Sequence, residues 1–130
     1  GSGALSNDRG ESHIAAFKIY GSLFFASIGK LEELVADPKH HTRVLILDMS
    51  KTVSLDTTGL DILQTLNRTL SKIGGQLIIC SLNNQPASMI ERSGFAETLG
   101  PRGISYSLTD ALLRAQLIVQ SDPVATDETA

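Results

Sequence analysis

The chain has 130 residues, and its 11 Lys and Arg stand against 14 Asp and Glu for a net charge of -3. This length predicts one domain with a real core, and the acidic balance gives no basic field for a polyanion, which argues against nucleic acid as a partner. Cys80 is the only cysteine, so it forms no internal disulfide and fits a reducing compartment, while no run approaches the roughly 18 apolar residues that span a bilayer.

The two ends of the chain differ in composition from its centre. Residues 1–12 are small and polar and open on Gly1-Ser2-Gly3, which looks like a cloning remnant on a piece of something longer. Residues 120–130 form an acidic tail without periodicity. We therefore predict a tag remnant and linker over residues 1–12, one domain over residues 13–119, and a disordered acidic tail over residues 120–130.

The first third of the chain predicts two strands and a helix. Residues 13–20 alternate imperfectly, and a break at residues 21–22 predicts a short second strand over residues 23–25. From Ser27 the apolar residues recur at helical spacing until Asp37-Pro38 stops the helix. The inward positions expected on the first strand are Ile14, Ala16 and Ile19.

The middle of the chain contains the two strands that look most buried. Residues 44–48 and 76–81 are runs of consecutive apolar residues, which are typical of strands covered on both faces. Between them lies one stripe of an amphipathic helix that ends at Gly74-Gly75. The stripe consists of Leu60, Leu63, Leu66, Leu70 and Ile73.

The last third predicts two helices and a short strand. Residues 83–86 turn the chain, and Pro86 starts a short helix that reaches Ser93. Residues 104–106 predict a strand, and the capping-box-like residues 107–110 begin the last helix.

Strands and helices thus alternate with short connections, which predicts an α/β fold. We expect a four- to five-stranded mixed sheet with a parallel centre, right-handed crossovers and about four helices. Binding sites in such open sheets lie beyond the carboxyl ends of the strands. The loop over residues 49–55, which follows the first buried strand, lies at such an end.

The residues that follow this loop have two interpretations. Asp56 is a good N-cap for the next helix, with Thr57 as the first helical residue and its hydroxyl exposed where free amides favour an anion. Gly59 keeps the first turn free of side-chain bulk, which is useful where another backbone approaches. A capped helix with two incidental threonines explains the same pattern, and the spacing alone does not choose.

A family resemblance covers residues 14–117. The stretch "VLILDMSKTVSLDTTGLDILQTLNRTLSKIGGQLIICSLNNQPASMIERSGF" resembles the STAS domain, named for sulfate transporters and anti-sigma-factor antagonists, with its Asp-x-Thr-Gly loop, Gly-Gly turn and Gln-Pro helix. The stretch "KIYGSLFFASIGKLEELV" is similar to the start of the C-terminal STAS domain of bacterial SulP-type anion transporters. Ser22 departs from that pattern, which commonly has proline there.

The resemblance implies a regulatory and protein-interaction domain on the cytoplasmic face of the bacterial inner membrane. Its expected partner is the transmembrane domain of the same transporter, which carries sulfate, bicarbonate, dicarboxylate or another anion. Neither an enzymatic activity nor a cofactor is implied.

The alternative is a stand-alone anti-sigma-factor antagonist. In that branch of the superfamily a partner kinase phosphorylates the first hydroxyl after the loop Asp, and Thr57 occupies this position. The added charge would then block partner binding. Hydrophobic spans encoded upstream of this segment would favour the transporter, and a natural start near Leu5 would favour the switch.

A polar rim is expected where the buried strands end, because residues 83–85 follow the second of them along the same edge. This rim could meet a protein, an acyl-carrier-type partner or, weakly, a nucleotide phosphate, although no glycine-rich phosphate fingerprint is present. The residues of this candidate loop are Ser54, Asp56, Thr57, Thr58, Gly59, Asn83, Asn84 and Gln85.

Three further groups favour simple structural roles. Asp48 closes a strand but lacks the neighbouring carboxylates of magnesium-dependent phosphotransfer. His40 and His41 are adjacent in a loop and do not face one metal, so no metal site is predicted. Phe24 and Phe25 are expected mainly in the core, although one ring of such a pair on a strand would point away from it towards a partner.

Overall fold

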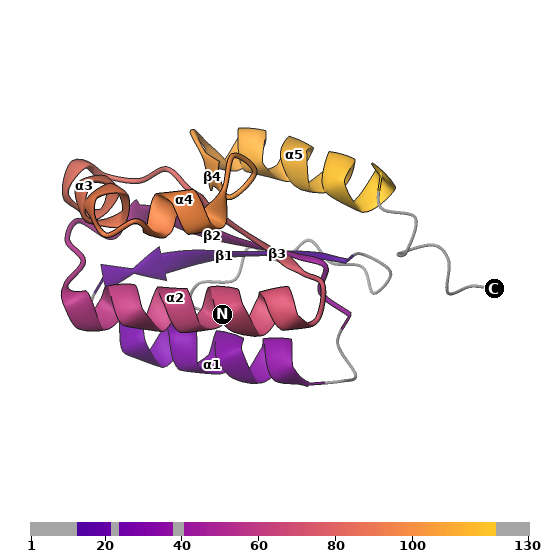
Figure 1. Cartoon of the computed structure of the whole chain (residues 1–130), viewed down its shortest axis with the longest axis horizontal. Helices are drawn as coiled ribbons and strands as arrows, with labels where there is room; N and C mark the ends of the chain where they lie inside the picture. Colours follow the sequence, from indigo (N-terminus) through magenta and orange to yellow (C-terminus); the bar gives the residue numbers. More distant parts are fainter. Residues whose placement is uncertain (1–12, 22–23, 38–40, 122–130) are drawn as a thin grey trace.

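The computed structural model describes residues 13–21, 24–37 and 41–121, which form a four-stranded sheet between helices (Figure 1). The strands are β1 (Ile14–Tyr20), β2 (Val44–Lys51), β3 (Gln76–Cys80) and β4 (Ile104–Ser105). They lie in the order β1-β2-β3-β4, and every pairing is parallel. The predicted α/β fold with a parallel centre is confirmed, and no antiparallel strand occurs among the described residues.

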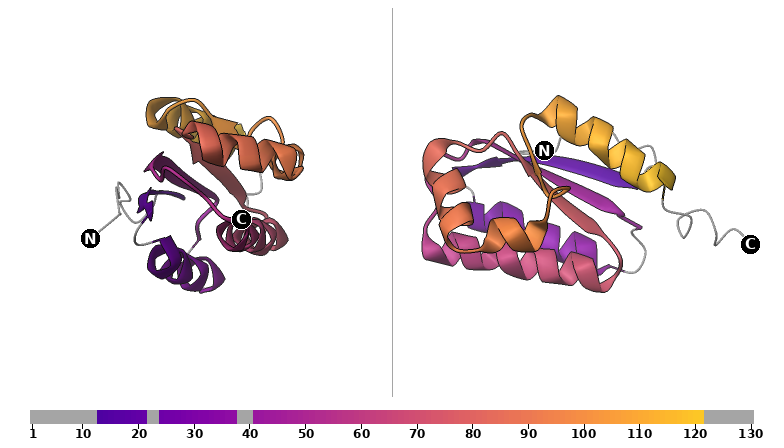
Figure 2. Two further views of the ribbon diagram at one scale, coloured as in Figure 1. Left: turned by 90° about the vertical axis from the view of Figure 1, so that its left-hand side faces the viewer. Right: turned by 45° about the horizontal axis from the view of Figure 1, so that its top comes forward.

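The helices cover both faces of this sheet. They are α1 (Phe24–Ala36), α2 (Thr57–Lys72), α3 (Asn84–Arg92), α4 (Phe95–Leu99) and α5 (Leu108–Ser121). In both views of Figure 2, α1 and α2 lie side by side on one face and α5 lies on the opposite one. Successive crossovers that step the same way along a parallel sheet place their helices on the same face, as α1 and α2 are placed.

Alternation along β2 and β3 divides the core into two parts. Leu45 and Leu47 belong to the larger part, with the leucines of α2, whereas Val44 and Ile46 pack with α5. All four are completely buried, which accounts for the unbroken apolar runs of these strands. Each large side chain removed from water in this way contributes roughly 1.5–3 kcal/mol to stability.

One prediction for the first third of the chain needs correction. Phe24 and Phe25 begin α1 and do not form a second strand. The reason is visible in the spacing, since position 24 continues the helical series of Ile28, Leu31 and Val35 backwards by four residues. Residues 22–23 and the side chains of the two phenylalanines lie outside what is described, so the prediction of an outward ring stays open.

Smaller differences occur at the element boundaries. β2 runs to Lys51, three residues beyond its predicted end. α3 begins at Asn84, so Pro86 lies in the first helical turn, where its missing N–H costs nothing. The five-residue α4 was not predicted, and α5 continues two residues past the predicted domain boundary at 119. The predicted linker and the rest of the predicted tail, residues 1–12 and 122–130, lie outside the described residues.

Candidate functional site

The β2–α2 loop, residues 52–56, lies at the carboxyl edge of the sheet, and its first residue, Thr52, joins it to β1. This side chain is 1% exposed, and its hydroxyl donates a hydrogen bond of 3.0 Å to the carbonyl oxygen of Ile19 at the end of β1. The Thr52 N–H also donates to the carbonyl oxygen of Met49 at 3.0 Å. A buried hydroxyl with a partner costs little, so Thr52 joins the loop firmly to the adjacent strand.

Asn83, which precedes α3, binds the end of β2 and the start of the loop through its side-chain amide. Its Nδ2 lies 2.9 Å from the carbonyl oxygen of Thr52, 3.2 Å from that of Ser50 and 3.5 Å from that of Met49. The turn that aims it contains Ser81, whose φ of 61° lies in the left-handed region that non-glycine residues seldom adopt. Such backbone strain persists only where the surrounding structure imposes it.

Gln85 binds the loop in the manner of a neighbouring strand. Its Oε1 accepts from the N–H of Leu55 at 2.6 Å, and its Nε2 donates to the carbonyl oxygen of Leu55 at 2.9 Å. Both main-chain groups of Leu55 are therefore satisfied by one side-chain amide from α3. The Leu55 side chain is itself buried in the larger part of the core.

Asp56 caps α2 as predicted. It has an extended backbone, and its Oδ1 accepts a hydrogen bond of 2.8 Å from the N–H of Gly59. The carboxylate also faces the positive end of the helix dipole. Thr57 is the first residue of α2, also as predicted, and both Thr57 and Thr58 are exposed.

The eight predicted residues thus gather at one edge, but they do different things. Asn83 and Gln85 point their amides at the backbone of the loop, and Gly59 is buried. The outward part of the site is made by Ser54, Asp56, Thr57, Thr58 and Asn84, all exposed. The predicted juxtaposition is confirmed, and the inward use of the two amides is new information from the structure.

Four residues of this edge were missed by the sequence reasoning. Val53 is 74% exposed and lies with Ser54 at the rim of a hollow of about 370 Å³, which is also lined by Tyr20, Gly21 and Lys51. Tyr20 and Lys51 occupy paired positions across β1 and β2. Their places at the last positions of two parallel strands were the available signal, because such ends meet at one edge.

Asp48 has the structural role expected of it. It is 4% exposed, and its Oδ1 accepts from the N–H of Ser50 at 3.0 Å. No group of three or more His, Cys, Asp or Glu side chains among the described residues could hold a metal ion.

Asp48 also acts on Cys80, which lies opposite it in the register of β2 and β3. Burial of the Cys80 thiol, assisted by the negative charges of Asp48 and Asp110, raises its pKa from 9.0 to about 11. The thiol is therefore protonated and unreactive at neutral pH.

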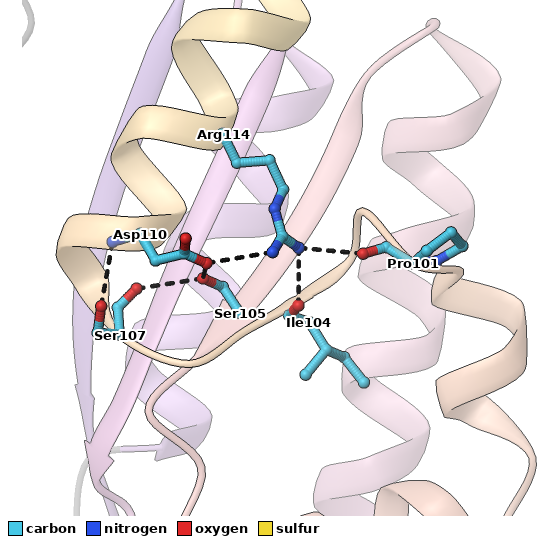
Figure 3. Close-up of polar contacts among 6 residues, drawn as sticks. All are labelled: Pro101, Ile104, Ser105, Ser107, Asp110 and Arg114. Atoms are coloured by element: carbon cyan, nitrogen blue, oxygen red, sulfur yellow. Dashed lines mark hydrogen bonds and ion pairs between the residues drawn. The ribbon is translucent and has the colours of Figure 1, made fainter.

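A second polar cluster, the β4–α5 corner, lies at the end of β4 (Figure 3). Asp110 accepts a short hydrogen bond from the Ser105 hydroxyl and one of 3.1 Å from Arg114. Arg114 also donates to the carbonyl oxygens of Ile104 at 2.8 Å and Pro101 at 3.0 Å. These bonds fasten the two-residue strand β4 to the first turns of α5.

A family model described as "STAS domain" matches residues 7–111, and the chain belongs to the STAS domain family. This family is typically non-catalytic, and its fold is the one described above. None of the helices in the described part of the chain has the length and apolar character needed to cross a membrane.

Three comparisons relate the chain to transporters. YvdB of Bacillus subtilis (strain 168), which is named as a sulfate transporter, is 29% identical to this chain over 93 residues. These residues are 71% of this chain and 18% of YvdB. The STAS domain of a SulP transporter from Vibrio cholerae superposes with a TM-score of 0.77 at 20% identity and covers 85% of this chain and 86% of that one. The murine anion transporter Slc26a9 gives a TM-score of 0.66 at 24% identity over 82% of this chain and 18% of its own.

The chain therefore spans about a fifth of the length of the relative YvdB. It resembles the STAS domains of SulP transporters in sequence and in fold.

Proposed function

We propose that this chain is the regulatory and docking domain of a SulP-type anion transporter and acts at the cytoplasmic face of a bacterial inner membrane. The comparison with YvdB supports a sulfate-transporter context, and in Slc26a9 a similar domain forms part of a whole anion transporter. The partner is then the transmembrane domain of the same protein. The domain catalyses nothing itself, and the choice of anion belongs to the membrane-spanning part.

The observation that carries this proposal is the construction of the β2–α2 loop. Its backbone is bound by Thr52, Asn83 and Gln85, while Val53, Ser54 and Thr57 project outward. A surface that is fixed before binding loses little conformational entropy when a partner arrives. The polar side chains that bind the loop backbone stabilise the loop, and those that project outward are available for recognition.

Val53→Asp is the sharpest test, because Val53 is 74% exposed and its replacement leaves the core unchanged. We expect a change in unfolding free energy within about 0.5 kcal/mol and loss of co-purification with the membrane part of the transporter, expressed separately. Ile73→Asp is the matched control, since Ile73 is 54% exposed at the far end of α2. Equal co-purification of both variants would contradict docking through this loop, as would an upstream reading frame without hydrophobic spans.

A second candidate function follows from Thr57. It is exposed at the first position of α2, next to Asp56, where an antagonist of the family would be phosphorylated. A phosphate there would add about -1.5 to -2 charge to the outward side of the loop. The chain would then be a stand-alone anti-sigma-factor antagonist that releases its partner when phosphorylated.

Mass spectrometry after incubation with a partner kinase tests this second function. It predicts phosphate on Thr57, none on Thr58, and no incorporation into the Thr57→Ala variant. Unmodified Thr57 after complete incubation would eliminate it.

A further inference from the structure

The hollow beside the β2–α2 loop has walls of two kinds. One is apolar and consists of the Tyr20 ring, 39% exposed, and the Val53 side chain, 74% exposed. The other is polar and consists of Lys51 and Ser54. A volume of about 370 Å³ is at the lower end of the range for ligand sites and suits one or two side chains.

Within the described part of the chain, Lys51 has no ion-pair partner. The residue is exposed. Asp56, the acid of the loop, accepts a hydrogen bond from the N–H of Gly59 and does not line the hollow. An exposed ammonium group at the edge of this hollow attracts a carboxylate, and an apolar side chain next to that carboxylate can pack on Tyr20 and Val53.

We propose that this hollow is a docking site for an acidic segment of a partner protein. A Glu or Asp side chain of that segment pairs with Lys51, and a neighbouring apolar side chain packs between Tyr20 and Val53. This rests on the proposed function only in that the same edge meets another protein, and it adds the chemistry of the segment that binds.

The end of α5 is disfavoured as an occupant, because it lies at the opposite end of the sheet from the loop (Figure 1). A nucleotide is also disfavoured. Phosphate groups are normally held by a glycine-rich loop or by several cations, whereas the residues that line this hollow include one cation, Lys51.

Titration of the 130-residue chain with two labelled peptides, followed by NMR, tests the proposal. One peptide alternates Glu with Leu, and the other replaces each Glu by Gln. The Glu peptide should shift the amide signals of Lys51, Val53 and Ser54 and saturate, and the Gln peptide should bind up to about 5-fold more weakly.

Three variants sharpen the result. Lys51→Glu should weaken the Glu peptide about 10-fold, and Lys51→Arg should keep it within about 3-fold, because the charge remains. Lys72→Glu makes the same change of charge at the far end of α2 and should have no effect. About 0.5 M salt should reduce the preference for Glu over Gln, because it screens an exposed pair.

Equal binding of the two peptides, or equal weakening by Lys72→Glu, would overturn the proposal. So would shifts of the same three amides by ATP or by phosphatidylglycerol vesicles when the Glu peptide gives none. If the peptide result fails while Val53→Asp still abolishes co-purification, docking stands without the Lys51 contact. If the peptide binds as expected but the membrane part does not co-purify, the transporter is the wrong partner.

Discussion

The β2–α2 loop and the β4–α5 corner are both polar joints at the carboxyl ends of strands, but they are tied to the protein differently. The side-chain hydrogen bonds that Thr52, Asn83 and Gln85 make to the backbone join residues 30 to 34 positions apart. Those of the corner join residues 2 to 13 positions apart.

The difference in sequence separation has a consequence for function. The corner uses its polar side chains on one another and on nearby carbonyl groups, so it fastens β4 to α5. The loop is held by its own buried Thr52 and by the amides of Asn83 and Gln85 from the start of α3, which leaves Val53 and Ser54 on the outward side. A loop with that construction can present a fixed surface to another molecule, and the variants below test this contrast from the largest expected effect to the smallest.

Gly103→Ala should be the most damaging change, and it acts on the corner. A Cβ at this position would lie 2.6 Å from the Leu99 Cβ and 2.7 Å from the Leu99 carbonyl oxygen. Because backbone cannot move aside cheaply, we expect a loss of about 3 kcal/mol in urea unfolding. Gly29→Ala is the control, since its Cβ would meet nothing within 4 Å in α1 and should stabilise the protein by about 0.5–1 kcal/mol. Similar losses in both variants would contradict this packing.

Alkaline pH should act through Cys80, which lies between the two regions in register with Asp48 and Ser105. Its pKa is about 11 in the folded protein, against the ordinary thiol value of 9.0 in the unfolded chain. Above pH 9 the unfolded chain therefore binds fewer protons, so stability should fall by about 2 kcal/mol between pH 9 and pH 11. Unfolding by denaturant across this range checks it, and Cys80→Ala should remove that part of the slope. An unchanged slope in the variant would show that the thiol has no such role.

Asn83→Ala should loosen the loop and leave the corner intact. The variant loses the amide that serves the carbonyl oxygens of Met49, Ser50 and Thr52, so we expect a loss of about 1–2 kcal/mol. Its neighbour Asn84 is exposed, and Asn84→Ala should change stability by less than about 0.5 kcal/mol. Denaturant unfolding of the two variants compares their stabilities. Equal stabilities would show that the Asn83 amide does not stabilise the loop.

Asp110→Asn should have the smallest effect, because the Asp110–Arg114 pair is partly exposed to solvent. An i, i+4 pair of this kind is worth about 0.3–0.5 kcal/mol, and salt screens it. We therefore expect a loss near that value at low ionic strength which shrinks in about 0.5 M salt. A loss of several kcal/mol, insensitive to salt, would show that the corner depends on this charge far more than its exposure suggests.

The parts of the site that sequence could predict are local or follow from a general rule. The Asp56 cap depends on an amide three residues away, and the meeting of residues 54–59 with residues 83–85 follows from the parallel order of β2 and β3. The inward direction of Asn83 and Gln85 could not be predicted, because a polar residue after a strand serves solvent, a partner or a distant backbone with the same sequence pattern.

The elements that were missed have physical explanations as well. α4 is five residues long between Gly94 and Gly100, which is too short to show helical periodicity. Phe24 and Phe25 carry high strand propensity, but the apolar spacing that continues through Ile28 and Leu31 places them in a helix. Tertiary packing of α1 on the sheet outweighs the local preference.

Hydrogen exchange at the Leu55 amide tests most directly whether the loop is held in place before any partner binds. This N–H donates to Gln85 Oε1 at 2.6 Å, so in the unmodified chain it should be protected, and in Gln85→Ala it should exchange on the order of 10-fold faster. The Ala111 amide, which donates to the Ser107 carbonyl oxygen in the corner, should keep its rate in both proteins. A Leu55 amide that exchanges as fast as an unprotected one, or equally fast in both proteins, would contradict the account.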